Sequence, residues 1–231
     1  MAKIVVLGAG TGGMPAAYEI KESLGKNHEV LMVNERPSFR FVPSNPWVAA
    51  GWRDPDAITM PIEKYLSKKD IHFKYARVDK IDPEQNILIT SDNEQIDYDY
   101  LVIATGPKLA FSNVKGTGPE GFTQSICTLD HAQKCYTDFE ALVKNPGPVV
   151  VGALQGASCF GPAYEYAFIL DKALRDAKIR HKVPIHYVTS EPYIGHLGLA
   201  GVGDSKSMLE SELRQRDIKW ICNANVDEVR D

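Results

Sequence analysis

The residues 3-KIVVLGAGTGGMPAAYEIKESL-24 decide how the rest of the chain is interpreted. The apolar run Ile4–Leu7 predicts a buried strand, and a glycine-rich turn follows it. After the turn, apolar residues recur at helical spacing: Ala17, Ile20 and Leu24. A strand, a glycine turn and a helix in this order are typical of a dinucleotide-binding β-α-β unit.

The turn carries the pattern G-x-G-x-x-G, with glycines at Gly8, Gly10 and Gly13. In this pattern Gly8 lets the chain turn tightly, Gly10 lets the backbone approach a pyrophosphate, and Gly13 lets the helix pack on the strand. Unpaired N–H groups at the start of the helix then bind the anion. The pattern alone is weak evidence, but the strand before it and the helix after it make a dinucleotide site the favoured interpretation.

A ribose contact is expected at the end of the second predicted strand, Glu29–Val33. In this fold an acidic residue about 20 positions after the last glycine binds the ribose hydroxyls. Glu35 has that spacing, and Asn34 is a neighbouring polar candidate. The alternative is that Glu35 is an ordinary solvent-facing glutamate.

The composition is that of a globular protein, with 44% hydrophobic and 24% charged residues among 231. A net charge of −4 and the lack of a basic run argue against a nucleic-acid partner. No apolar run is long enough to span a bilayer, and the chain enters its first strand directly, so no signal peptide is expected.

The remainder of the first half is expected to complete this unit. Pro43 and Pro46 favour an extended loop over Phe39–Trp52, whose large aromatic residues either plug a core or form an apolar wall beside a flat ring system. The later elements are predicted as a short helix (Ile58–Tyr65), a hairpin of Ile71–Val78 and Asn86–Thr90 that turns at Asp82-Pro83, and a buried strand (Tyr100–Ala104) that runs into Thr105-Gly106-Pro107.

The second half begins the same pattern again. Pro148–Val151 predicts a strand, and Pro162 suits the first position of a helix. That helix has apolar residues at Ala163, Ala167, Leu170 and Leu174. The glycines depart from G-x-G-x-x-G, since they stand at Gly152, Gly156 and Gly161. The later elements are predicted as a strand (Ile185–Thr189), a helix (Met208–Arg216) and a strand or hairpin (Trp220–Val229).

The predicted fold class is therefore α/β, with two Rossmann-like dinucleotide-binding domains. The first is expected over residues 1–110, and the second, degenerate and incomplete, over residues 111–231. A protein with two such domains normally returns to its first domain after the second. No C-terminal return segment is present, so we interpret the chain as the N-terminal part of a longer design.

Four cysteines are too few and too scattered for a disulfide scaffold, and none has metal-ligand spacing: Cys127, Cys135, Cys159 and Cys222. Cys159 lies in a glycine loop just before a predicted helix, where the helix dipole favours the thiolate and lowers the pKa of the thiol. Glu165, in the same helix, is a candidate to accept or relay a proton. The alternative for Cys159 is loop packing.

Two histidines are further candidates. Cys127 follows a presumed strand, TQSIC, and His131 stands four residues later, which is the spacing of a reactive Cys/His pair on a helix. His196 is the titratable group near neutral pH in the glycine-rich loop Glu191–Lys206. Cys135 and Cys222 have no polar neighbours in the sequence and are interpreted as packing residues.

Several longer motifs together resemble sulfide:quinone oxidoreductase, a membrane-associated flavoprotein of the two-dinucleotide-domain, glutathione-reductase-like class. They are VVLGAGTGGMPAAYEI, FVPSNPW, DYLVIATGPKLAF, QSIC, GASCFGPAYEY, and EPYIGHLG with GVGDSK, and they cover essentially the whole chain. A type II NADH dehydrogenase would share the first glycine loop and the ATG motif, but not the two cysteine motifs.

The resemblance implies FAD as the cofactor. FAD would lie along the glycine turn, with its ribose at the end of the second strand, its adenine near one residue of the hairpin, its ring system beside a proline and a threonine-glycine pair closing over it. The residues implied are Gly8, Gly10, Thr11, Gly12, Gly13, Asn34, Glu35, Val78, Pro43, Thr105 and Gly106.

The resemblance also implies the chemistry. Cys159 would be one half of a redox-active pair that takes up sulfide sulfur as persulfide or polysulfide, and electrons would pass through FAD to membrane quinone. Cys127 matches a third cysteine that assists sulfur handling, and the proton-transfer residues are Glu165, His131 and His196. The partner cysteine, the second FAD segment, the quinone pocket and a peripheral membrane-binding segment would lie beyond residue 231.

Two alternatives stay open at this point. One is a non-catalytic FAD-binding fragment of such an enzyme. The other is the flavin subunit of a flavocytochrome sulfide dehydrogenase, against which the lack of an export signal counts. The expected partners are sulfide and membrane quinone, and the oligomeric state, a homo-oligomer included, stays open.

Overall fold

The computed structural model describes all residues, 1–231, and the chain forms two compact units. Unit 1 consists of Met1–Val42 with Asp56–Leu109, and unit 2 of Pro43–Pro55 with Ala110–Asp231. Each unit has its own parallel sheet, so the predicted α/β class with Rossmann-like architecture is confirmed. The observed division differs from the predicted one because residues 43–55 group with the second unit.

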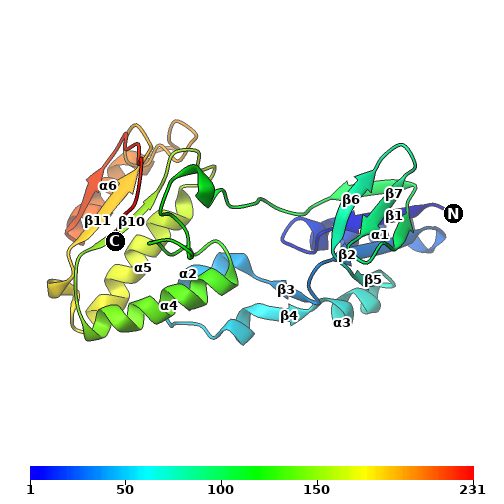
Figure 1. Cartoon of the computed structure of the whole chain (residues 1–231), viewed down its shortest axis with the longest axis horizontal. Helices are drawn as coiled ribbons and strands as arrows, with labels where there is room; N and C mark the ends of the chain where they lie inside the picture. The colour runs from blue at the N-terminus through cyan, green and yellow to red at the C-terminus, as the bar shows by residue number, and fades with distance from the viewer. The chain divides into compact units, whose positions relative to one another are not determined.

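Unit 1 is built on a four-stranded parallel sheet in the order β5-β2-β1-β9. Its strands are β1 (Lys3–Leu7), β2 (Glu29–Asn34), β5 (His72–Tyr75) and β9 (Tyr100–Ile103), and its helices are α1 (Gly13–Leu24) and α3 (Ile62–Leu66). Strands β1, β2 and β5 are labelled in Figure 1. On the helix-covered face Val6 and Met32, both fully buried, pack with Ala17 of α1. The near-continuous apolar strands are those of a sheet that is covered on both faces.

The second face of this sheet is covered by a three-stranded antiparallel sheet of β6 (Val78–Asp82), β7 (Ile87–Thr90) and β8 (Gln95–Asp97). Leu88 and Ile96 from this layer pack against Val5 and Val33. The hairpin predicted around Asp82-Pro83 is therefore present, but its first strand is β6 and not Ile71–Val78. Residues 72–75 instead extend the parallel sheet, because Ile71 and Phe73 pack into the core under α1 and α3.

The extended loop predicted over Phe39–Trp52 is wrong. The segment forms strand β3 (Ser38–Arg40), a 3-10 turn and helix α2 (Asn45–Ala49), and β3 pairs with β4 (Thr59–Pro61). Proline is compatible with the first turn of a helix, where its missing N–H is not needed, and Pro46 lies there. The helix predicted over Ile58–Tyr65 is likewise shorter, since β4 precedes α3.

The two tryptophans near α2 lie at the surface of unit 2. Trp47 and Trp52 are 36% and 42% exposed and meet edge to face with ring centroids 6.5 Å apart. The guanidinium of Arg53 lies 4.2 Å from the Trp47 ring centroid, as in a cation–π pair. The small residues of α2 are buried instead, so these rings do not plug the core.

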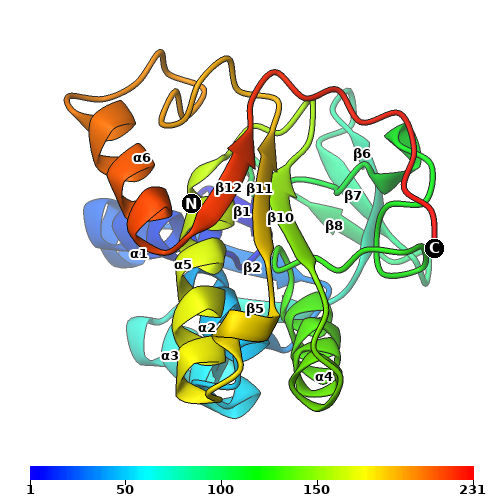
Figure 2. The same cartoon turned by 90° about the vertical axis from the view of Figure 1, so that its left-hand side faces the viewer.

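Unit 2 has a three-stranded parallel sheet of β10 (Val149–Ala153), β11 (Ile185–Thr189) and β12 (Ile218–Ile221), whose arrows run side by side in Figure 2. Alternate residues of these strands face helices α5 (Gly161–Asp176) and α6 (Ser205–Gln215). The core formed there contains Ile185, Tyr187, Leu174 and Leu213, each 1% exposed or less. The predicted strand–helix–strand pattern of the second half is confirmed, but the last strand is β12 (Ile218–Ile221), and the prediction of a strand or hairpin over Trp220–Val229 is wrong.

Helix α4 (Leu129–Lys144) is absent from the sequence-based prediction, and the strand predicted at TQSIC is wrong. Thr128 is the N-cap of α4, and its side chain accepts a hydrogen bond of 3.2 Å from the backbone N–H of His131. One face of α4 is apolar and includes Leu129 and Ala132, which are buried. The cap and this face explain why the chain becomes helical directly after Cys127.

Leu24 is also misassigned, because it is 39% exposed and not part of the α1 core face. Helix α1 contacts the sheet through its first turns, where Gly13 and Ala17 are buried. The helix then ends at Gly25, whose φ of 62° is in the left-handed region that favours glycine. Leu24 therefore lies at an exposed helix end.

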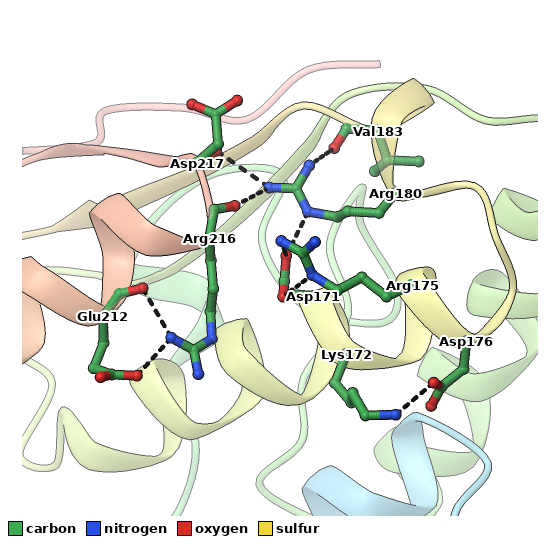
Figure 3. Close-up of polar contacts among 9 residues, drawn as sticks. All are labelled: Asp171, Lys172, Arg175, Asp176, Arg180, Val183, Glu212, Arg216 and Asp217. Atoms are coloured by element: carbon green, nitrogen blue, oxygen red, sulfur yellow. Dashed lines mark hydrogen bonds and ion pairs between the residues drawn. The ribbon is translucent and has the colours of Figure 1, made fainter.

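A cluster of charged residues around the buried Asp171 holds the C-terminal half of α5 in unit 2 (Figure 3). Asp171, 3% exposed, accepts hydrogen bonds from Nε of Arg175 at 2.8 Å and from Nε of Arg180 at 2.6 Å. Arg180 also donates to the carbonyl oxygens of Val183 and Arg216, at 2.7 and 2.6 Å. The cluster therefore ties α5 to the chain entering β11 and to the end of α6.

Candidate functional site

The glycine turn of unit 1 is as close-packed as a dinucleotide site requires. A Cβ atom on Gly13 would lie 1.8 Å from the carbonyl oxygen of Gly8, so only glycine allows α1 to approach β1 this closely. Gly8 has a φ of 101°, and a Cβ atom there would meet the carbonyl oxygen of Ala104 at 2.3 Å. Added Cβ atoms on Gly10 and Gly12 would instead face open space. The open side of the turn is therefore the side that can receive a ligand.

Helix α1 begins without a side-chain cap, because its N-cap residue is Gly12. Within the first turn, Met14 and Ala16 donate to the carbonyl oxygens of Gly10 and Gly12, and Pro15 has no N–H. The Gly13 N–H has no acceptor in the protein and lies at the glycine turn, where Thr11 is also exposed. An unpaired N–H and the positive end of the helix dipole favour an anion. These features fit a dinucleotide pyrophosphate.

Asn34, the last residue of β2, and Glu35, which follows it, have different roles. The Asn34 side chain accepts a hydrogen bond of 3.0 Å from the N–H of Ala9 and donates one of 2.8 Å to the carbonyl of Arg36. It therefore shapes the glycine turn. Glu35 is exposed and its nearest charged partner is Arg36, at 3.9 Å. Of the two, Glu35 has the free carboxylate that a ribose contact needs.

The other proposed cofactor residues lie on separate elements. Thr105 and Gly106 follow β9 and are exposed, and Gly106 has a φ of 75° with open space around it. Val78 is the first residue of β6 and is half-buried against the core of the antiparallel layer. Pro43 begins the segment of unit 2 that contains α2.

Cys159 is an exposed free thiol at the end of the loop between β10 and α5. Phe160, its neighbour, is the N-cap residue of α5 and is buried, and Pro162 lies in the first turn. The backbone there anchors the loop while leaving the thiol accessible. Glu165 is exposed on the same helix.

Cys127 is a second exposed thiol, placed directly before α4, and its N–H donates to Oγ of Ser125 at 3.1 Å. His131 lies in the first turn of α4, and its ring packs against Phe111 with centroids 5.8 Å apart. Nδ1 of His131 is buried without a hydrogen-bond partner. This histidine borders a hollow of about 170 Å³ that Glu120 also lines.

Cys135 is not the unaccompanied packing residue that the sequence indicates. Its Sγ lies 3.0 Å from the hydroxyl of Tyr166, the residue after Glu165. This contact joins α4 to α5. Burial raises the pKa of the Cys135 thiol. Cys135 is therefore a buried link between the two helices that follow Cys127 and Cys159.

His196 lies in a loop with an unusual backbone. Its Nδ1 accepts a hydrogen bond of 3.2 Å from the N–H of Gly198, and its ring meets Tyr193 edge-on with centroids 5.2 Å apart. A Cβ atom on Gly198 would lie 3.3 Å from the ring of Phe160. The structure thus brings the His196 loop against the residue next to Cys159.

Sequence reasoning missed Glu191, which is 1% exposed at the carboxyl end of β11. It stands where Glu35 stands in unit 1, shortly after the second strand of a β-α-β unit, and this position was a signal that could have identified it. Its carboxylate accepts hydrogen bonds from Tyr164 and Thr189, each 2.8 Å long, and from the N–H of Leu197, at 2.7 Å. The carboxylate is therefore internal and its partners belong to the protein.

The fold and the glycine turn define a dinucleotide-binding protein with exposed thiols in its second unit. The family model described as pyridine nucleotide-disulphide oxidoreductase matches residues 2–231, and the chain belongs to this family. Enzymes of this family bind FAD, and FAD is the cofactor.

Among the relatives, the sulfide-quinone reductase of Aquifex aeolicus is 44% identical over 99% of this chain and 53% of its own length. The crystal structure of the sulfide:quinone oxidoreductase from Aquifex aeolicus superimposes with a TM-score of 0.95 at 42% identity, over 100% of this chain and 53% of that one. A mitochondrial external NAD(P)H-ubiquinone oxidoreductase B1 from Solanum tuberosum is 30% identical over 49% of this chain and 21% of its own length. The chain spans about half the length of the first of these relatives.

Two further features bear on the site. No cluster of three or more histidine, cysteine, aspartate or glutamate residues is arranged to bind a metal ion. No helix combines the length and the apolar content that crossing a bilayer requires.

Proposed function

We propose that the chain forms the FAD-binding and cysteine-bearing part of a sulfide:quinone oxidoreductase, which oxidises sulfide to polysulfide or sulfur and passes the electrons to membrane quinone. The observation that carries the proposal is Cys159, an exposed free thiol in the loop that enters α5, on a chain that has an open dinucleotide turn. The 44% sequence identity of the chain to a sulfide-quinone reductase supports sulfide as the substrate.

FAD fits the residues of unit 1. The pyrophosphate would lie against the open side of the turn at Gly10 and Gly12, the ribose against Glu35, and Thr105-Gly106 would provide close backbone approach. The adenine contact at Val78 and the flavin contact at Pro43 belong to the same proposal. When bound, FAD supplies the acceptor for a pair of electrons.

Cys159 would carry the sulfur. A sulfur–sulfur bond would form between its thiolate and a hydrosulfide ion, giving a cysteine persulfide. Formation of this bond releases one proton and two electrons, and the two electrons would pass to the cofactor and then to quinone. A thiolate is the form of cysteine that reacts. Cys127 would be a second sulfur-holding thiol, and the released proton would pass to Glu165, His131 or His196.

The relatives named for NAD(P)H suggest a second function, in which unit 2 binds a pyridine nucleotide. Two observations favour sulfide over this function. Glu191, the acid in the ribose position of unit 2, is 1% exposed and already accepts three hydrogen bonds. The Gln155 side chain, in the glycine loop after β10, is bonded to both backbone groups of Val226, at 2.7 and 3.1 Å. A ribose and a pyrophosphate would have to displace these contacts.

Peripheral membrane association belongs to the proposal for the whole protein, because the reduction of membrane quinone requires it. A flavocytochrome-type dehydrogenase would share the sulfide chemistry and would reduce a cytochrome in place of quinone. A flavin that sulfide leaves oxidised would contradict the proposed function and indicate the alternative, a non-catalytic FAD-binding fragment.

The proposal is tested by replacing Cys159 with serine and following the flavin absorbance after anaerobic addition of sulfide. We expect reduction by sulfide in the parent protein and none in Cys159→Ser. The matched control is Cys135→Ser, a change at a buried thiol outside the proposed site. Unchanged reduction in Cys159→Ser would remove this residue from the mechanism.

A further inference from the structure

The loop between β11 and α6 carries an unusual density of left-handed backbone. Six of the nine residues from 195 to 203 have positive φ, and two of them are not glycine: Leu197 at 56° and Ala200 at 61°. A non-glycine residue in this region is strained and persists only where the surrounding structure holds it. His196 directly precedes one of these residues, so its position depends on what holds the loop.

The buried carboxylate of Glu191 holds the loop at Leu197. One carboxylate oxygen accepts the hydrogen bond from the Leu197 N–H at 2.7 Å, and the other accepts from the hydroxyls of Tyr164 and Thr189 at 2.8 Å each. All three partners donate, which is the pattern that satisfies an ionised carboxylate. The strained residue is thus fixed by a charged acceptor.

Tyr164 holds the loop at its other end. Its hydroxyl oxygen accepts a hydrogen bond of 3.0 Å from the N–H of Gly195, while its proton goes to Glu191. Burial raises the pKa of the Tyr164 phenol, so the hydroxyl stays protonated at neutral pH and remains a donor. The residues on both sides of His196 are therefore attached to one buried network.

The same network reaches the start of α5. Tyr164 lies in the first turn of that helix, beside Glu165 and close in sequence to Cys159. Its ring stacks on Tyr187 of β11 with centroids 4.4 Å apart, and the Phe160 ring packs against Gly198 in the loop. The start of α5 and the His196 loop are therefore held together by direct contacts.

We propose that Glu191, with Tyr164 and Thr189, is a positioning residue that holds the His196 imidazole beside the Cys159 loop. The catalytic part of this inference rests on the proposed sulfide chemistry, but the holding of the loop does not. Glu191 occupies the position from which a dinucleotide fold reads a ribose, and here the carboxylate serves the protein's own loop.

Two tyrosines provide a matched pair of variants. Tyr164→Phe removes a hydroxyl that bonds both Glu191 and the N–H of Gly195, whereas Tyr187→Phe removes a neighbouring buried hydroxyl that bonds neither of them. The two rings stack on each other and both residues are at most 3% exposed, so each variant removes one buried hydroxyl from an equally buried ring. Thr189→Val, with Thr189→Ser as its control, tests the network from β11 if Tyr164→Phe does not fold.

The first readout is amide hydrogen exchange in the loop, which needs no activity. We expect exchange at Gly195 and Leu197 to accelerate about tenfold or more in Tyr164→Phe, because a hydrogen bond to a charged group is lost, and to stay unchanged in Tyr187→Phe. Equal exchange in the two variants would overturn the inference.

The second readout is the rate of flavin reduction by sulfide in the flavin-loaded protein. We expect this rate to fall in Tyr164→Phe and Glu191→Ala, to recover in part in Glu191→Gln, and to be unchanged in Tyr187→Phe. A faster-exchanging loop with an unchanged rate would overturn the catalytic part. A parent protein that sulfide does not reduce would refute the proposed function, and the exchange comparison would still decide the network.

Discussion

Replacing Gly13 by alanine gives a severe test of the glycine turn. Gly13 lies in the first turn of α1 with ordinary helical φ, where alanine would normally stabilise by about 1 kcal/mol. Here the added Cβ would lie 1.8 Å from the carbonyl oxygen of Gly8, and contacts under 3.0 Å require something to move. Because the neighbour is backbone, α1 must shift by more than an ångström from the sheet.

Such a displacement breaks the packing of Ala17 against Val6 and Met32, which are all fully buried. Overpacking of a close-packed core costs about 3 kcal/mol where backbone must move, so the net loss after the helix propensity is about 2 kcal/mol. Gly10→Ala is the matched control. Its added Cβ meets nothing within 4 Å and its φ suits an alanine, so the fold should be retained while FAD binding weakens.

The two units can be followed separately in this experiment. All three tryptophans, Trp47, Trp52 and Trp220, lie in unit 2, so tryptophan fluorescence reports on that unit and circular dichroism on both. In urea, Gly13→Ala should lower the midpoint of the dichroism transition and leave the fluorescence transition in place. A Gly13→Ala protein as stable as its parent would contradict the close packing of α1 on β1. A Gly10→Ala protein that binds FAD as tightly as its parent would contradict the placement of the ligand at the open side of the turn.

Further predictions concern the buried charges and thiols. Asp171→Asn should lower the free energy of unfolding by about 3–5 kcal/mol in a urea titration, because it leaves Arg180 without its buried counter-charge. Lys172→Met, at an exposed ion pair, should change the free energy of unfolding by less than about 1 kcal/mol in the same titration. Iodoacetamide should modify Cys159 and not Cys135 near neutral pH, as read by peptide mass spectrometry, because burial raises the Cys135 pKa and thiolate forms there only at higher pH. Equal labelling of the two thiols would contradict this assignment.

The sequence predicts best what short-range patterns encode. The strand, glycine turn and helix at residues 3–24 and the second strand are observed, because a buried parallel strand and a helix each have a distinctive hydrophobic period. Helix α4 was missed because its N-cap, Thr128, follows a stretch with strand-like composition, and residues 43–55 were misassigned because prolines suit both a loop and a first helical turn.

In the candidate site, too, the local features are predicted from the sequence and the long-range ones are not. Glycine spacing identifies Gly8 and Gly13, whose close contacts are local. The sequence cannot show which way a side chain turns after a strand, and this decides the difference between Glu35, exposed, and Glu191, 1% exposed. The network around Glu191 joins residues as far apart as 164 and 197, and only the packed tertiary structure brings them together.

The most direct test of the proposed function is the visible flavin absorbance of the purified protein under anaerobic conditions, with sulfide and with NADH added separately. We expect a flavin band that sulfide bleaches and NADH does not, and no bleaching by sulfide in Cys159→Ser. A flavin that NADH bleaches while sulfide leaves it oxidised would contradict the proposed function.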